Sequence, residues 1–205
     1  MLCSSKGGVG KTTLSSHLAV EAERAGAGRI ALADTDPQGG LAAWYNVRAA
    51  TTPVFIDVSS GLAAAIAACK KGHIDILFVD TPPSATATIS AVVAHADLCV
   101  VPVRPSPNDL RAVGSTVALI RKARKPMIFA INQVTPRARI TSEAAIALSQ
   151  HGTVAPTMLA SRVDFATSMT DGRTAGELDA SSKSGSEVTA LWSYIAGRLN
   201  EEEES

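Results

Sequence analysis

Aromatic residues and cysteines are scarce in this chain of 205 residues, and a net charge is absent. Aromatics make up 4% of the sequence and hydrophobic residues 46%, which disfavours a sandwich of aromatic-rich strands and suits helices packed on a buried parallel sheet. Lysine plus arginine and aspartate plus glutamate both number 19, so no global field attracts the molecule to nucleic acid or to a membrane. Any binding of a polyanion must therefore come from a local patch of charge.

Few features of the sequence point to a secreted or membrane-spanning protein. The three cysteines, Cys3, Cys69 and Cys99, are odd in number and lack the paired spacing of a metal site, which favours a reduced, cytoplasmic protein. No apolar run reaches the roughly 18 residues that a spanning helix needs, and the first residues lead into a glycine-rich loop without room for a signal peptide. We expect one domain over residues 1–200 and a disordered acidic tail over residues 201–205.

Apolar runs and helical patterns alternate along the chain. Strands are predicted at residues 1–5, 29–34, 54–58, 74–80, 98–103, 127–131 and 154–159. Helices are predicted at residues 12–25, 41–47, 61–71, 86–96, 142–151 and 187–199, and a long helix follows a cap at Ser106 or Asn108 and ends near Arg124. Residues 176–185, rich in serine, glycine and alanine, are expected to form a mobile loop. The alternation predicts a three-layer α/β fold with a mostly parallel central sheet, helices on both faces, and ligands at the carboxyl ends of the strands.

The most informative segment is a glycine-rich turn between the first strand and the first helix. It reads Lys6-Gly7-Gly8-Val9-Gly10-Lys11-Thr12-Thr13, and such a turn presents backbone N–H groups to a phosphate at the N-terminus of a helix. We expect residues 7–13 to bind the nucleotide, with Lys11 reaching the β- and γ-phosphates and Thr13 the α-phosphate. Thr12 should place its hydroxyl on Mg²⁺.

The head of this loop departs from the usual P-loop, which starts with glycine where this chain has Ser5. Lys6 adds a second lysine at the head of the loop, so the segment resembles the deviant Walker A motif of the ParA and MinD superfamily. The resemblance implies an ATP-dependent sandwich dimer in which Lys6 crosses to the phosphates of the partner. Only five residues precede Lys6, and we expect the true start of the protein to lie upstream.

Acidic residues follow two of the predicted strands. Asp34-Thr35-Asp36-Pro37-Gln38 resembles the first switch of that superfamily, which implies that Asp36 activates the attacking water and that Asp34 supports the water shell of the metal. Asp80 resembles a Walker B acid, which holds Mg²⁺ through water, and residues 81–83 would form the second switch. The alternative is that these acids only cap turns.

The base of the nucleotide is expected beside Asn132, which follows another strand. Guanine-specific P-loop proteins carry Asn-Lys-x-Asp at such a strand end, and here the segment Asn132-Gln133-Val134-Thr135 lacks the final acid. Adenine is therefore favoured, with Asn132 as a contact; the alternative is that Asn132 caps a turn. The family resemblance also places residues 161–164 near the base.

The resemblance is nearest to short partition proteins of the ParF type. It implies a weak Mg²⁺-dependent ATPase that dimerises on ATP, binds DNA without reading its sequence, and coats the nucleoid in the cytoplasm. Hydrolysis stimulated by a centromere-binding partner of the ParB or ParG type would release it, so that plasmids or chromosomes are partitioned. The candidate DNA contacts are Arg121, Lys122, Arg124 and Lys125. The alternative for this cluster is a solvated helix end that the helix dipole favours.

Other functions on the same fold are weighed against partition. A relative that distributes chemotaxis clusters or other cargo would share every residue named above, so it stays open. A MinD-like division-site regulator would need a basic membrane-binding helix, but residues 201–204 are all glutamate, and we expect no membrane partner. A nitrogenase-reductase-type subunit would need cysteines at a dimer seam, and a metabolic kinase or ligase would need a substrate-binding cluster that the sequence lacks.

Overall fold

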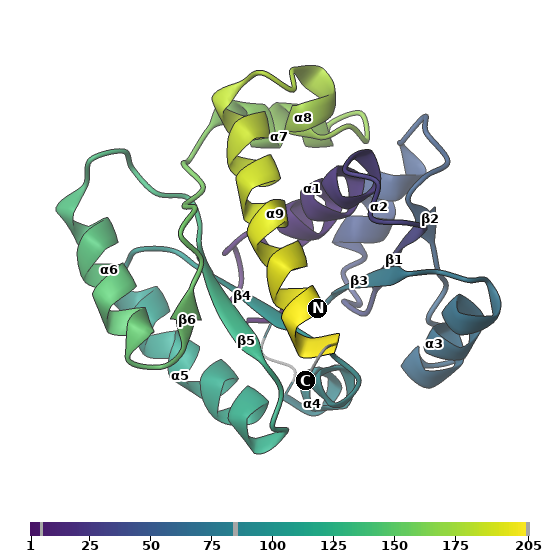
Figure 1. The fold of residues 1–205 in the computed structure, drawn as a ribbon, viewed down its shortest axis with the longest axis horizontal. Coiled ribbons are helices and arrows are strands. Elements are labelled where there is room, and N and C mark those ends of the chain that lie inside the picture. Colours follow the sequence, from purple (N-terminus) through teal and green to yellow (C-terminus); the bar gives the residue numbers. More distant parts are fainter. Residues whose placement is uncertain (5, 84–85, 204–205) are drawn as a thin grey trace.

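The computed structural model describes residues 1–4, 6–83 and 86–203. The departure from the usual P-loop at Ser5 and the last two residues of the expected tail lie outside the described residues. The fold has a central sheet between two helical layers (Figure 1). The predicted three-layer α/β architecture is confirmed.

The sheet consists of parallel strands in two groups of three. β1 (Ile30–Asp34) lies between β2 (Val54–Phe55) and β3 (Ile76–Asp80), and β5 (Met127–Ile131) lies between β4 (Cys99–Val103) and β6 (Thr153–Val154). Leu2 joins the two groups through single bridges to Asp80 and Val100. Within residues 1–4, the strand predicted at residues 1–5 is thus reduced to the two bridges of Leu2, which lies at the centre of the sheet.

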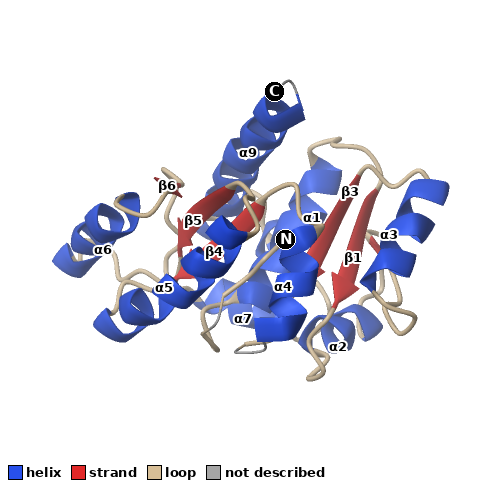
Figure 2. Cartoon of the chain, turned by 90° about the horizontal axis from the view of Figure 1, so that it is seen from below, coloured by secondary structure: helices blue, strands red, loops and turns tan. Residues whose placement is uncertain are grey.

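Nine helices are found among the described residues and cover both faces of the sheet (Figures 1 and 2). They are α1 (Lys11–Arg24), α2 (Gly40–Asn46), α3 (Leu62–Lys71), α4 (Thr86–Ala94), α5 (Pro107–Lys122), α6 (Arg139–Ser149), α7 (Val163–Met169), α8 (Ala175–Leu178) and α9 (Lys183–Glu203). The core on one face includes side chains of α1 and α9, and the core on the other includes side chains of α4, α5 and α6.

Alternation along the strands distributes apolar side chains between the two cores. In β5, Ile128 and Ala130 pack with α1 and α9, whereas Phe129 and Ile131 pack with α4 and α5. All four are fully buried, because a parallel strand covered on both faces has no solvent-facing side. The continuous apolar runs in the sequence therefore mark central strands.

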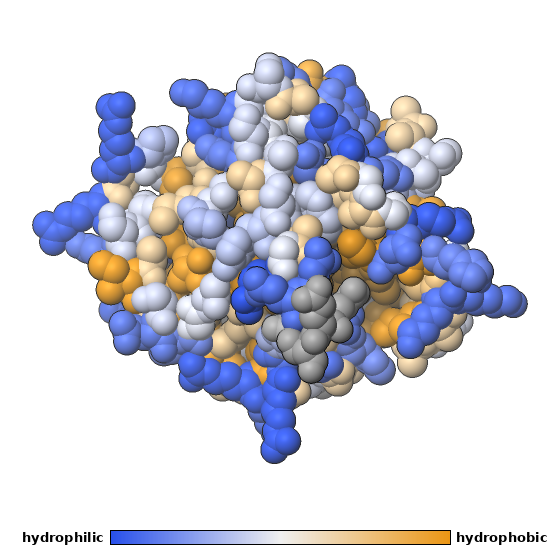
Figure 3. Space-filling model, in the orientation of Figure 1, coloured by the Kyte–Doolittle hydropathy of each residue, from blue (hydrophilic) through white to orange (hydrophobic). Residues whose placement is uncertain are grey.

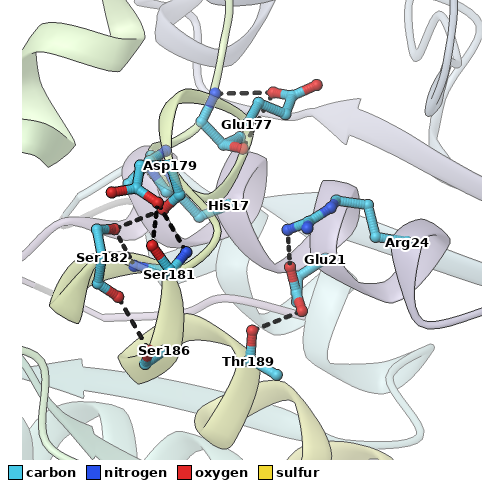
Figure 4. Close-up of polar contacts among 12 residues, drawn as sticks. His17, Glu21, Arg24, Glu177, Asp179, Ser181, Ser182, Ser186 and Thr189 are labelled. Carbon is cyan, nitrogen blue, oxygen red and sulfur yellow. Dashed lines mark hydrogen bonds and ion pairs between the residues drawn. The ribbon is translucent and has the colours of Figure 1, made fainter.

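The carboxyl-terminal region is more ordered than its composition suggests. Two short helices, α7 and α8, were not expected, and the loop predicted at residues 176–185 is instead the junction of α8 and α9 (Figure 4). Asp179 Oδ1 accepts hydrogen bonds from the backbone and hydroxyl of Ser181 at 2.8 and 2.6 Å, and Ser182 Oγ accepts one from Gly185 N at 3.0 Å. Serine and aspartate here form a helix start, since their side chains satisfy backbone donors. α9 continues to Glu203, so residues 201–203 of the expected tail are helical.

The surface shows two apolar features. Hydrophilic side chains project around the rim of the molecule, and hydrophobic residues reach the surface between them on the sides of α6 and α3 (Figure 3). A groove of about 940 Å³ lies beneath Leu2 at the amino edge of the sheet, between β3 and β4. No helix within the described residues combines the length and hydropathy that a bilayer crossing requires.

Candidate nucleotide site

The glycine loop and the start of α1 surround a pocket of about 340 Å³ at the carboxyl edge of the sheet. Its lining is formed by Gly7, Gly8, Gly10, Lys11, Thr12, Thr13, Asp36, Pro83 and Gln133. Gly8 and Gly10 have φ angles of 73° and 91°, which glycine adopts without steric strain. The N–H groups of residues 11–13 have no acceptor among the described residues. The pocket therefore presents backbone donors at a helix N-terminus, as binding of an anion requires.

The two lysines of the loop occupy different environments. Lys11 is 6% exposed and its Nζ donates to the carbonyl of Lys6 at 3.2 Å. Burial lowers the pKa of Lys11, while the negative charges of Asp80 and Asp36 act to raise it. Lys6 is half-buried and is not among the residues that line the pocket. Lys11 is thus placed to contact phosphates in its own pocket, and Lys6 stands outside it.

Thr12 and Asp80 form the shortest polar contact described at the site. Thr12 Oγ1 donates to Asp80 Oδ2 at 2.5 Å, and Asp80 is 1% exposed. Burial, together with the charge of Asp34, raises the pKa of Asp80 to about 7, although the Thr12 hydrogen bond and the charge of Lys11 oppose this. A carboxylate so deeply buried is short of positive charge, which a divalent cation would supply.

The donor set at this point fits Mg²⁺, which binds hydroxyl, carboxylate and phosphate oxygens. No group of three His, Cys, Asp or Glu side chains that could hold a metal occurs in the described part of the chain. An ion would therefore depend on Thr12, on Asp80 and on the phosphates of a nucleotide. This matches the sequence-based expectation for Thr12 and Asp80, which stays a prediction.

Asp34 and Asp36 have different surroundings. Asp34 pairs in register with Asp80, and its Oδ2 accepts two backbone N–H groups from the first turn of α2, at 3.0 and 3.1 Å. Its Oδ1 accepts the N–H of Asp36 at 2.9 Å, so both oxygens hold the turn together. Asp36 lines the pocket, and its Oδ1 accepts only the N–H of Gln38 among the described contacts. Asp36 thus faces the ligand space, whereas Asp34 organises the turn that carries it.

Asn132 and Gln133 hold the phosphate loop from the opposite side. Asn132 Nδ2 donates to the carbonyl of Val9 at 2.8 Å, and Gln133 Nε2 donates to that of Gly8 at 3.0 Å. Asn132 Oδ1 accepts the N–H of Gln133 at 2.9 Å, and Asn132 is 7% exposed. The amide of Asn132 is directed at the loop, so its expected contact with adenine stays a prediction. Gln133, which lines the pocket, was missed, and its only sequence signal is its position after a strand.

Two further expectations stay predictions, namely that the backbone of Val9 contacts the phosphates and that residues 161–164 lie near the base. The side chain of Val9 is 1% exposed and does not line the pocket, because it packs inward while its carbonyl accepts from Asn132. Residues 161–164 do not line the phosphate pocket, so their expected position near the base stays a prediction. Arg162 pairs with Glu187 of α9 at 2.6 Å, and Val163 is 78% exposed.

His17 connects the phosphate loop helix to the carboxyl-terminal region. Its Nδ1 lies 2.8 Å from the carbonyl of Thr13, and its Nε2 accepts the N–H of Ala175 at 3.1 Å. The bond to Thr13 requires a proton on Nδ1, and the bond from Ala175 requires an unprotonated Nε2, so the ring is neutral. Burial lowers the pKa of His17 to about 4. The helix after the phosphate loop is therefore tied to α8 through one side chain.

The four DNA-binding candidates lie together at the end of α5, far from the pocket. α5 runs from the carboxyl end of β4 to the amino end of β5, so its last turn is at the opposite edge of the sheet. Arg121 Nη2 donates to the carbonyl of His151 at 2.8 Å, and Arg124 and Lys125 border the groove beneath Leu2. Arg121, Lys122 and Arg124 are exposed. The structure thus leaves these charges accessible without joining them to the nucleotide site.

Known proteins resemble the chain both in sequence and in fold. The maintenance of carboxysome distribution protein A of Halothiobacillus neapolitanus is 34% identical over 146 residues, which cover 66% of this chain and 66% of that protein. The chromosome-partitioning ATPase Soj of Thermus thermophilus is 29% identical over 153 residues, covering 60% and 61%. The matches thus span about two thirds or less of the length of these relatives.

A solved structure and a family comparison cover more of the chain. The septum site-determining protein MinD of Pyrococcus horikoshii, solved with Mg-ADP, superposes with a TM-score of 0.79 at 15% identity, covering 98% of this chain and 96% of that one. This similarity establishes the fold. Residues 1–174 match the CobQ/CobB/MinD/ParA nucleotide binding domain. Together with the phosphate loop and its pocket, this match shows that the chain belongs to the CobQ/CobB/MinD/ParA family of nucleotide-binding domains.

Proposed function

We propose that the chain is a weak, Mg²⁺-dependent ATPase of the ParA type that positions a cargo within the cell. The observation that carries the proposal is the arrangement of the two lysines. Lys11 lies in the pocket beside Thr12 and Asp36, whereas Lys6 lies outside it. If two copies close face to face on ATP, Lys6 gains a phosphate to contact, namely that of the partner. ATP then acts as the switch between monomer and dimer.

The proposed reaction transfers the γ-phosphoryl group of ATP to water. Backbone N–H groups of the loop and Lys11 hold the phosphates, and Lys6 of the facing copy neutralises charge that develops in the transition state. Thr12 and Asp80 would hold Mg²⁺, whose charge offsets that of the β- and γ-phosphate oxygens. Asp36, with an oxygen left for a ligand, orients the attacking water. Hydrolysis would be slow and would limit the lifetime of the dimer.

Cargo positioning is the first candidate for the use of this switch. The carboxysome distribution relative shares a higher identity with the chain than Soj does, over similar lengths. Partition of a plasmid or chromosome, which the family resemblance favoured, is the second candidate and is supported by the Soj match. In both proposed uses, non-specific DNA would serve as the track and a partner protein would stimulate hydrolysis.

The switch is tested with three variants and a hydrolysis assay. Lys6→Ala should stay monomeric with ATP, and Asp36→Ala should accumulate as an ATP-bound dimer, as measured by analytical ultracentrifugation. Lys71→Ala, which removes an exposed lysine at the end of α3, serves as the control and should dimerise and hydrolyse normally. A Lys6→Ala variant that dimerises and turns over like the wild type would contradict the proposal.

The DNA surface is tested separately. Arg121→Ala with Arg124→Ala should weaken binding to random duplex DNA and reduce the log–log salt slope by about 2, while ATP binding is unchanged. Arg139→Ala, on the exposed face of α6, is the matched control. An unchanged isotherm for the double variant would exclude the end of α5 as the DNA surface.

The two uses are distinguished in the native cell. Deletion of the gene should make a cargo assembly cluster or lose its even spacing, with plasmid and chromosome inheritance intact. Loss of a replicon with cargo distribution unchanged would instead support partition. A gene for a small DNA-binding protein beside this one would support partition as well.

A further inference from the structure

Arg104 lies at the rim of the phosphate pocket. It follows β4 directly, at the carboxyl edge of the sheet that also carries the glycine loop. Its Nη1 is 4.0 Å from the point where a Cβ on Gly8 would stand. Arg104 does not line the pocket, and its side chain is 35% exposed. The guanidinium therefore stands beside the loop, outside the ligand space of its own chain.

Asp109 fixes the orientation of this guanidinium. Arg104 Nε donates to Asp109 Oδ2 at 2.7 Å and Nη2 donates to Oδ1 at 3.2 Å, which is a two-point contact. The side chain of Asp109 is 1% exposed, and the hydroxyl of Ser106 donates to it at 2.8 Å. Nη1 has no hydrogen-bond partner among the described residues. One edge of the guanidinium is thus held rigidly, while the edge beside Gly8 is left for a ligand.

Lys6 lies within electrostatic reach of the same carboxylate. Burial by itself would raise the pKa of Asp109, but hydrogen bonds from Arg104 and Ser106 and the charges of Arg104 and Lys6 hold it below its ordinary value. Two cations thus share one buried acid, and the rim keeps a net positive charge. Because like charges repel, an anion between two such rims would favour their approach.

We infer that Arg104 acts with Lys6 in trans, and that its free Nη1 contacts the phosphates of a nucleotide bound by a facing copy of the chain. The inference rests on the proposed ATP-dependent dimer. A planar guanidinium that is already held by a carboxylate loses little freedom when it binds phosphate. The two cations oppose dimerisation when the pocket holds no triphosphate and favour it when a γ-phosphate lies between the two rims.

The competing explanation is that Arg104 only stabilises the start of α5. Ser106 is the N-cap of that helix and accepts the N–H of Asp109, so Arg104 could serve the cap alone. A purely structural role would change the stability of the fold without any preference between ATP and ADP. A role across the dimer would change ATP-dependent association and leave ADP binding to the monomer intact.

The test compares variants that separate these roles. Arg104→Ala removes the cation, and Arg104→Ala combined with Asp109→Asn also removes the buried charge that the single change would leave unpaired. Arg104→Lys keeps the positive charge but removes the planar guanidinium and its two-point contact. Arg111→Ala, which removes an exposed arginine on α5, is the matched control. Dimerisation is measured by sedimentation with a hydrolysis-resistant ATP analogue, and ADP binding by calorimetry.

We expect both variants that contain Arg104→Ala to raise the dimer dissociation constant about tenfold or more, as expected from the loss of a hydrogen bond to a charged group. The effect of Arg104→Lys should be smaller, and the ADP affinity should stay within about twofold of wild type in every variant. The inference is overturned, and the proposed function is not, if wild type and the double variant dimerise equally well. The same conclusion follows if the double variant loses ADP affinity by the same factor as it loses dimer affinity. If wild type and Arg111→Ala both stay monomeric with the analogue, the proposed switch fails, and the inference fails with it.

Discussion

The side-chain amide of Asn132 donates to the carbonyl of Val9 at 2.8 Å, across 123 residues of sequence. This bond fixes the middle of the phosphate loop to the end of β5. The loop glycines allow the backbone to follow its path, and Asn132 limits how far it can move. The shape of the phosphate site is therefore set by a neighbouring strand as much as by the loop itself.

Replacing Asn132 tests what this amide does. Asn132→Ala leaves the buried Val9 carbonyl without a partner, at a cost of about 1–3 kcal/mol, and loosens the loop. Affinities for ATP, ADP and GTP should then fall together, by about tenfold, in calorimetric titrations. Gln133→Ala, which removes the more exposed neighbouring bond, should have a smaller effect. A selective loss of ATP affinity relative to GTP would show instead that Asn132 reads adenine.

Gly10 is the loop position least able to accept a side chain. A Cβ there would lie 2.4 Å from Asn132 Nδ2, and φ is 91°. Gly10→Ala should therefore abolish detectable nucleotide binding and reduce the free energy of unfolding by about 1–3 kcal/mol. Gly114→Ala, on α5 with open space around it, should be neutral or stabilising by up to about 1 kcal/mol. Denaturant unfolding measures both, and equal effects at the two glycines would disprove the steric argument.

His17 should make the stability of the fold depend on pH. Its pKa falls from the ordinary 6.5 to about 4 in the folded protein, so the fold favours the neutral ring. The contribution of His17 to the free energy of unfolding is fully present above pH 6.5. It declines as the pH falls towards about 4, because the histidine of the unfolded chain is protonated first. The loss should be on the order of 3 kcal/mol. His17→Gln should flatten this segment of the stability profile, while His151→Gln, on an exposed ring, should leave it unchanged.

Arg48 joins the region of the first switch to α8. Its side chain is 3% exposed, and its guanidinium lies over the ring of Trp44. The guanidinium donates to both carboxylate oxygens of Glu177 at 2.9 and 2.7 Å and to the carbonyl of Gly172 at 2.7 Å. Arg48→Ala should lower the free energy of unfolding by about 3 kcal/mol or more, because it leaves the partly buried carboxylate of Glu177 without its cation. Arg139→Ala, which removes an exposed pair with Glu143, should cost less than about 0.5 kcal/mol. Thermal denaturation of the two variants decides the comparison, and a similar loss in both would contradict it.

Much of the fold could be derived from the sequence because its signals are local. Continuous apolar runs such as residues 127–131 become strands buried on both faces, and the parallel order follows from their alternation with helices. The central strand was overestimated, since among the described residues 1–4 only Leu2 forms bridges. α7 and α8 were missed because they are only seven and four residues long, too short for a helical apolar pattern to show.

The candidate site divides in the same way. The phosphate loop and the two acidic strand ends are each formed by a contiguous segment, which includes Lys6, Lys11 and Thr12 in the loop. The sequence alone therefore determined the phosphate loop, the family and the acids that lie at one edge of the sheet. The tertiary structure alone decided how each group is used: Asp34 holds a turn, Asp36 faces the pocket, and Asn132 holds the loop. It also brought Arg104 beside Gly8 and His17 beneath α8. These contacts join residues that are far apart in the chain, and only the packing of helices on the sheet determines their distances.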